Sequence, residues 1–151
     1  MVSPPHPSPL LEGLRRCFAA AGDPSISLWQ QQYMRNQFLF FGIKTPHRRQ
    51  LQRTLFVPEL LPATVEELEV VVAQCWEEPQ REMQYAALDL LELCKHLLQA
   101  SSLHRIVEPC IRTLSWWDTV DMLASHMVGH LLKTFPEEHS DTMEEWIHDQ
   151  D

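Results

Sequence analysis

Prolines and helix-capping residues divide this chain into a regular series of short segments. Ser8-Pro9, Asp23-Pro24 and Thr45-Pro46 each join a side chain that can cap a helix to a proline that fits its first turn. Thr64 followed by Glu67 has the spacing of a capping box. Behind these starts, apolar residues recur every three or four positions, and alternation with a period of two is nowhere sustained. The sequence therefore predicts an all-α protein.

The same signals predict the order of the helices. Seven helices are expected to start near residues 8, 23, 45, 64, 79, 101 and 117, the second of them running toward a break at Phe41-Gly42. Short turns favour antiparallel pairs, and the segments 76–81 and 146–151 look like two copies of one corner. No partner follows the last helix, so we expect an N-terminal fragment of a helical-repeat protein: a repeat domain over 8–151, incomplete at its C-terminal end, after a Pro-rich disordered segment, 1–7.

Composition excludes several classes of protein. The chain has four glycines among 151 residues and no glycine-rich phosphate-binding motif. It contains no run of apolar residues of signal-peptide or membrane-spanning length, which predicts a cytoplasmic protein without a membrane partner. Its four cysteines are widely spaced within helical patterns, which predicts buried thiols rather than disulfides or a zinc site.

Charge is distributed unevenly along the chain. Residues 1–56 hold seven Lys or Arg and two acidic residues, whereas residues 57–151 hold five and nineteen, although the overall net charge is −9. Between Arg35 and Arg53 no acidic residue occurs, and Lys44, Arg48 and Arg49 lie at the predicted third helix. A local basic face of this kind suits the phosphates of DNA, which could also accept from the first-turn amides of that helix. The alternative is an ordinary solvated cationic face.

The stretch Ser115 to Asp121 has the most unusual chemistry. It reads Ser-Trp-Trp-Asp-Thr-Val-Asp and precedes an apolar run, so Ser115 or Asp118 can cap a new helix. On that helix Trp117 and Asp121 are four residues apart and share a face. An aromatic ring beside a carboxylate is a good receptor for a flat or cationic group. The alternative is structural: tryptophans that fill a core and aspartates that cap a helix.

Three blocks of this sequence, in order, resemble a known family. They are Tyr33 to Arg49, then Trp76 with Arg81 to Leu88, then Ser115 to Asp121 with Gly129. These blocks are similar to the AlkD-like DNA alkylation repair glycosylases, and the resemblance covers roughly residues 25–150. It implies a HEAT-like, right-handed α-solenoid that removes cationic alkylated purines, such as N3-methyladenine and N7-methylguanine, from duplex DNA without a cofactor.

The resemblance also implies roles for particular residues. Asp121 matches the family's catalytic carboxylate, and Trp117 matches an aromatic residue that packs against the deoxyribose of the lesion. Trp116 and Asp118 are secondary candidates for the same site. Tyr33 resembles a family position near the DNA. The basic residues Lys44, Arg48 and Arg49 are expected to contact phosphates. The protein is expected to be a monomer. A further arginine and aromatic residue of the family have no counterpart before Asp151, so full activity is expected to need residues beyond it.

Other residues, and a different class of function, also have to be considered. His126 and His130 are four residues apart on one helix and could chelate a metal, but Met127 stands where a zincin would have glutamate, and no metal is predicted. Glu82 is expected to be structural, as a partner for an arginine or as a charge at a helix start. The alternative to an enzyme is a non-catalytic helical-repeat scaffold that binds DNA or protein.

Overall fold

Helices make up most of residues 6–149, the part of the chain that the computed structural model describes. Nine are α-helices: α1 (Pro9–Ala21), α2 (Pro24–Tyr33), α3 (Thr45–Leu55), α4 (Val65–Trp76), α5 (Arg81–Leu93), α6 (Glu108–Arg112), α7 (Trp117–Met122), α8 (Gly129–Thr134) and α9 (Pro136–His148). Between them lie η1 (Lys95–Leu97), a turn of 3₁₀-helix, and two segments with π-type hydrogen bonds, η2 (Leu103–Val107) and η3 (Leu123–Val128). The predicted all-α class is confirmed.

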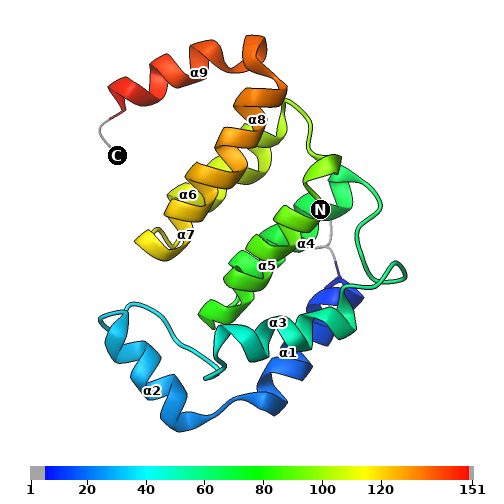
Figure 1. Cartoon of the computed structure of the whole chain (residues 1–151), viewed down its shortest axis with the longest axis vertical. Coiled ribbons are helices and arrows are strands. Elements are labelled where there is room, and N and C mark those ends of the chain that lie inside the picture. The colour runs from blue at the N-terminus through cyan, green and yellow to red at the C-terminus, as the bar shows by residue number, and fades with distance from the viewer. Residues whose placement is uncertain (1–5, 150–151) are drawn as a thin grey trace.

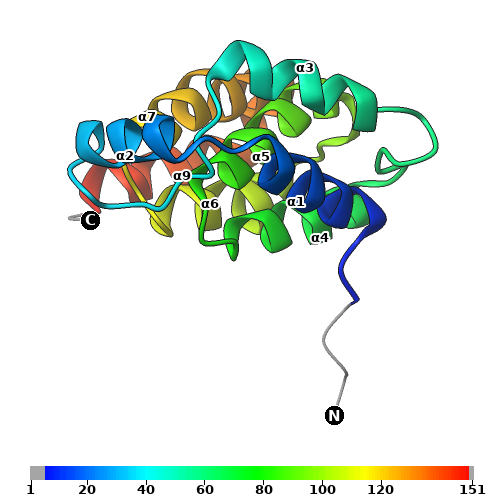
Figure 2. The same ribbon diagram turned by 90° about the horizontal axis from the view of Figure 1, so that it is seen from below.

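The helices stack in antiparallel pairs. In Figure 1 the stack rises from α1 and α3, through α4 and α5, to the segments that hold α6, α7 and α8, with α9 at the top. Figure 2 shows two layers, with α3, α5 and α7 in one and α1, α4 and α6 in the other. Neighbouring pairs are in contact, because α1 packs on α4, and α5 packs on both α7 and η3. This is the predicted packing of an α-solenoid.

A continuous apolar core runs between the layers. Phe18 of α1 and Met83 of α5 are fully buried, as are Leu123 and Met127 of η3. Ala86 and Ala87 on α5 are also fully buried, and their small side chains permit the close approach of α4. The four cysteines are free thiols; three of them are buried as predicted, but Cys17 is only partly buried. Burial raises the pKa of Cys75 to about 12, which keeps this thiol protonated and unreactive.

Three of the predicted capping residues are found at helix starts. The Ser8 hydroxyl accepts from the amide of Leu11, and the Asp23 carboxylate accepts from the amides of Ser25 and Ile26. Thr64 accepts from the Glu67 amide in the predicted capping box. Lys44, by contrast, is the N-cap of α3 and makes no side-chain capping bond. Local sequence therefore sets the positions of α1, α2 and α4.

One predicted boundary and one predicted cap were wrong. The second helix ends at Tyr33 instead of running toward Gly42, because Arg35 and Asn36 adopt left-handed backbone with φ of 54° and 57°. Ser115 does not cap α7, since its hydroxyl donates to the carbonyl of Ile111. The predicted disordered segment 1–7 and the repeated corner 146–151 fall partly outside the described residues.

The segment after Trp117 is one long helix. Helical backbone continues through the ends of α7, η3 and α8, so that residues 117–134 form a single rod with π-type hydrogen bonds in its middle. Such π segments often occur near functional sites. No helix within residues 6–149 is both long and apolar enough to cross a lipid bilayer.

Candidate DNA repair site

Three aromatic side chains form an exposed surface where α2 meets the start of α7. Trp29 and Tyr33, four residues apart on α2, stack with ring centroids 5.4 Å apart and an interplanar angle of 14°. Tyr33 then meets Trp117 edge to face, with centroids 6.4 Å apart. All three are more than half exposed, at 62%, 62% and 54%. We call Trp29, Tyr33 and Trp117 the aromatic ridge.

Asp121 lies one helical turn after Trp117 and is exposed to solvent. Its carboxylate has no hydrogen bond or ion pair with any residue between 6 and 149, whereas its backbone carbonyl accepts from the Ser125 hydroxyl at 2.7 Å. The i, i+4 spacing places this carboxylate on the helix face that carries the Trp117 ring. An exposed aromatic surface and an exposed carboxylate therefore lie about one helical turn apart.

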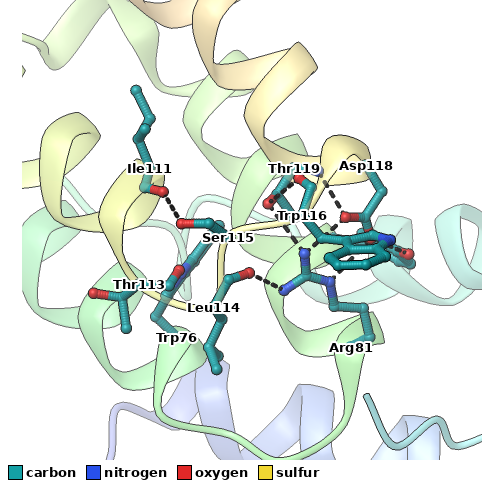
Figure 3. A network of polar contacts seen from close by, with 10 residues as sticks. Trp76, Arg81, Ile111, Thr113, Leu114, Ser115, Trp116, Asp118 and Thr119 are labelled. Atoms are coloured by element: carbon teal, nitrogen blue, oxygen red, sulfur yellow. Dashed lines mark hydrogen bonds and ion pairs between the residues drawn. The ribbon is translucent and has the colours of Figure 1, made fainter. Parts of the chain in front are cut away.

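Asp118 has a different environment and a structural role. Its two carboxylate oxygens accept from Arg81 Nη2 at 2.7 Å and Nε at 3.0 Å, and the Tyr85 hydroxyl donates to it at 2.6 Å. Figure 3 shows the Arg81 guanidinium between this carboxylate and the Leu114 carbonyl, which accepts at 3.0 Å. Arg81 is fully buried and Asp118 nearly so. The Asp118 carboxylate is therefore committed to holding the start of α7.

Three aromatic side chains lie around the ion pair of Arg81 and Asp118. The Arg81 guanidinium lies 3.7 Å from the ring centroid of Phe38, in the connector between α2 and α3. Burial and the hydrogen bond to Asp118 raise the pKa of Tyr85, so its hydroxyl stays protonated and donates. Trp116 is half-buried at the N-cap of α7, with no side-chain capping bond.

Glu82, next to Arg81, positions the other side of the site. Its carboxylate accepts from three consecutive amides, those of Phe41, Gly42 and Ile43, at 2.9, 2.9 and 3.2 Å. Burial raises the pKa of Glu82, although the three hydrogen bonds oppose that shift. The predicted structural role is therefore confirmed, but the partner is a loop of backbone amides instead of an arginine.

This loop crosses the start of α2 at very short range. Gly42 has φ of +95°, and a Cβ at that position would lie 2.0 Å from the carbonyl oxygen of Asp23. The Asp23 amide donates to the Gly42 carbonyl at 3.0 Å. Only glycine fits this contact, which fixes α2, and with it Trp29 and Tyr33, on the loop that Glu82 holds.

The predicted phosphate-binding residues fall into two groups. Lys44 is exposed, and its ammonium group has no partner among residues 6–149. Arg49 is half-exposed and forms an ion pair with Asp89 of α5 at 3.1 Å. Arg48, however, is only 4% exposed and is held by Asp89 at 2.9 Å and by Gln52. The Arg48 guanidinium is enclosed between α3 and α5, so the predicted contact with a phosphate would require this ion pair to open.

Asp89 explains this arrangement. Burial alone would raise its pKa, but hydrogen bonds from Arg49, Gln52 and Arg48 outweigh burial and hold the pKa of Asp89 below its usual value. The carboxylate therefore stays charged and neutralises part of the basic stretch. Because Asp89 lies forty residues further along the chain, the local sequence gave no sign of this partner.

A second group of basic side chains lines an open groove on the same layer. The groove has a volume of about 720 Å³ and includes Lys95, His126, His130 and Lys133, with one acidic residue, Glu92. Glu92 pairs with Lys95 at 2.9 Å and lies 3.8 Å from His126. Both histidines line this groove. Within residues 6–149 no cluster of three or more potential metal ligands occurs.

Sequence reasoning did not single out Trp29, Lys95 or Lys133. The i, i+4 spacing of Trp29 and Tyr33 was the one available signal, but the same spacing describes a core-facing stripe. Lys95 and Lys133 come together only through the packing of α5 against the 117–134 helix.

Comparison with known families agrees with these features. The chain matches the sequence profile of a family described as DNA alkylation repair enzyme over residues 14–151. That range includes all of the residues of the ridge, Asp121 and the basic groove. A comparison with curated proteins found no match. The chain therefore belongs to the family of DNA alkylation repair enzymes, and its function lies in DNA alkylation repair.

Proposed function

We propose that this protein is a DNA glycosylase that excises cationic alkylated purines, such as N3-methyladenine and N7-methylguanine, from duplex DNA. The observation that carries the proposal is the exposed carboxylate of Asp121, which has no partner among residues 6–149 and lies one turn from Trp117 in the aromatic ridge. Family membership supplies the class of damage, and the side chains suit the reaction that such damage permits.

Alkylation at N3 or N7 gives the purine a positive charge and makes it a good leaving group. When the bond between C1′ and the purine nitrogen breaks, its electron pair neutralises the base, and positive charge develops on the deoxyribose. The Asp121 carboxylate stabilises that charge and orients a water molecule, whose oxygen bonds to C1′ while a proton is lost. Trp117 would pack against the sugar and exclude bulk water.

Asp121 suits this role better than Asp118 for a physical reason. Electrostatic catalysis requires a carboxylate that can reach the sugar, and Asp118 is enclosed by Arg81 and Tyr85. The charge of Asp118 is also balanced by the Arg81 guanidinium. Of the two aspartates in the motif, one orients the helix and the other acts on the substrate.

Duplex DNA would lie across the layer formed by α3, α5 and the 117–134 helix. Lys44 and Arg49 lie near the start of α3, and the Lys95–Lys133 groove lies between the end of α5 and the 117–134 helix. Arg49 would exchange part of its pairing with Asp89 for a phosphate oxygen. These contacts are electrostatic and independent of sequence, so binding should weaken steeply as salt increases.

Gly129 allows the groove to be tested without disturbing the core. A Cβ at this position has no atom within 4 Å, so Gly129→Glu introduces a carboxylate among the basic groove residues at little steric cost. We expect it to weaken binding of duplex DNA roughly fivefold and to lower the salt dependence of log Kd by about one. Fluorescence anisotropy of a labelled duplex at several salt concentrations measures both quantities. Gly129→Ala is the matched control, and equal affinities for the two variants would exclude the groove from the DNA interface.

The proposed activity is tested by incubating the purified protein with a duplex that contains a single N7-methylguanine. Chromatography of the supernatant is expected to show the free base accumulating faster than it is lost spontaneously, and alkali should then cleave the DNA at the abasic site. A protein that binds the duplex but releases no base is the predicted behaviour of a non-catalytic scaffold, and it would overturn the glycosylase proposal.

A further inference from the structure

Helix α2 places its aromatic side chains on the surface instead of in the core. It contributes no fully buried residue, and Leu28, Trp29 and Tyr33 are all more than half exposed. Polar contacts hold the helix: the Ser27 hydroxyl donates to the Phe40 carbonyl at 2.7 Å, and the Gln30 amide donates to the Ile43 carbonyl at 3.0 Å. A cluster of exposed aromatic residues held in this way is typical of a binding surface.

A pocket lies at the Trp29 end of the aromatic ridge. Its volume is about 320 Å³, and it is lined by Ser25, Ile26, Trp29 and Lys44. The Tyr33 ring stacks on Trp29, so the ridge leads from this pocket to Trp117 and the Asp121 carboxylate. Trp29 therefore belongs both to this pocket and to the aromatic ridge that includes Trp117.

The chemistry of the pocket combines an aromatic surface with a single positive charge. Lys44 has no ion-pair partner among residues 6–149, although it is next to an exposed indole ring. None of the four residues that line the pocket is acidic. Asp23, the N-cap of α2, accepts from the Ser25 hydroxyl and from two amides at the start of that helix. A flat ring attached to an anion matches this combination, which is the structure of a nucleotide.

We propose that this pocket binds one unpaired nucleotide of the DNA, with its base stacked on Trp29 and its phosphate paired with Lys44. Neither a paired base nor a bare phosphate would use both features, because the duplex hides the faces of its bases. Such a nucleotide would come from the strand near the lesion, where a damaged pair opens easily. The proposal rests on the DNA-binding part of the proposed function and not on its chemistry.

The test compares two unmethylated duplexes that differ only in one unpaired nucleotide. Binding is measured by anisotropy of the labelled DNA and by quenching of tryptophan fluorescence. The wild-type protein is expected to prefer the duplex with the unpaired nucleotide, and Trp29→Ala to lose roughly tenfold in affinity for that duplex alone. Trp29→Phe should retain most of the preference, because its ring still stacks. Lys44→Ala should weaken binding and reduce its salt dependence.

Leu28→Ala is the matched control, because Leu28 is equally exposed on the same helix but does not line the pocket. Circular dichroism should show no change in helix content for any of these variants. An equal loss on both duplexes in Trp29→Ala, or a wild-type protein that binds an acidic aromatic peptide as tightly as the unpaired nucleotide, would overturn the assignment. A protein that shows the Trp29-dependent preference but releases no methylated base would overturn only the glycosylase chemistry.

Discussion

Asp121→Asn is expected to slow release of N7-methylguanine from duplex DNA by about 100- to 1,000-fold. Asparagine keeps the size and shape of the side chain but removes the charge that would stabilise the positive sugar. Because the Asp121 carboxylate has no partner among residues 6–149, its loss should leave the free energy of unfolding within about 0.5 kcal/mol of the wild-type value. Single-turnover release with excess enzyme isolates this effect from product dissociation.

Asp141→Asn provides the control for that measurement. Asp141 is an exposed aspartate on α9, so its substitution removes the same charge elsewhere on the surface. Its rate of base release should match that of the wild-type protein. A rate for Asp121→Asn within threefold of this control would mean that Asp121 does not stabilise the developing charge, and another group would have to be sought.

Asp118→Asn should act mainly on stability, with a loss of about 3–5 kcal/mol in the free energy of unfolding. This substitution leaves the fully buried guanidinium of Arg81 without a compensating charge. It also removes the carboxylate that accepts from the Tyr85 hydroxyl. Urea unfolding followed by circular dichroism measures the change, with Asp121→Asn as the comparison three residues away in the same motif.

The rates of base release of the two variants should also depend differently on temperature. Base release by Asp118→Asn should recover on cooling, because a larger fraction of the protein is folded and Trp117 returns to its position beside Tyr33. Release by Asp121→Asn should stay low at every temperature at which the protein is folded. A loss below about 1 kcal/mol in Asp118→Asn would show that the buried pair with Arg81 does not hold α7 in place.

Much of the fold could be predicted because its signals are local. Ser8, Asp23 and Thr64 act within three residues of their own positions, and each caps the expected helix. The early end of α2 depends on the left-handed backbone of Arg35 and Asn36, which neither residue requires by itself. The π-type hydrogen bonds of η3 had no recognisable pattern in the sequence either.

In the candidate site, too, local features could be predicted and long-range partners could not. Trp117 and Asp121 lie on one helix, so their spacing was enough to place them on one face, and the structure confirms that Asp121 is exposed. The partners that distinguish Asp118 and Arg48 are Arg81 and Asp89, which are distant in sequence and adjacent only after the helices stack. The run of basic residues in the sequence therefore predicted more exposed positive charge than the folded surface has.

Arg81 and Glu82 begin α5, and each holds a different side of the site. Arg81 fixes the start of α7 through Asp118, while Glu82 fixes the loop on which α2 rests. Both side chains are fully buried, so neither can touch a nucleic acid. In a survey of inactive variants, substitutions at positions 81 and 82 are therefore expected to appear together with those at Asp121, although Arg81 and Glu82 only position the two sides of the proposed site.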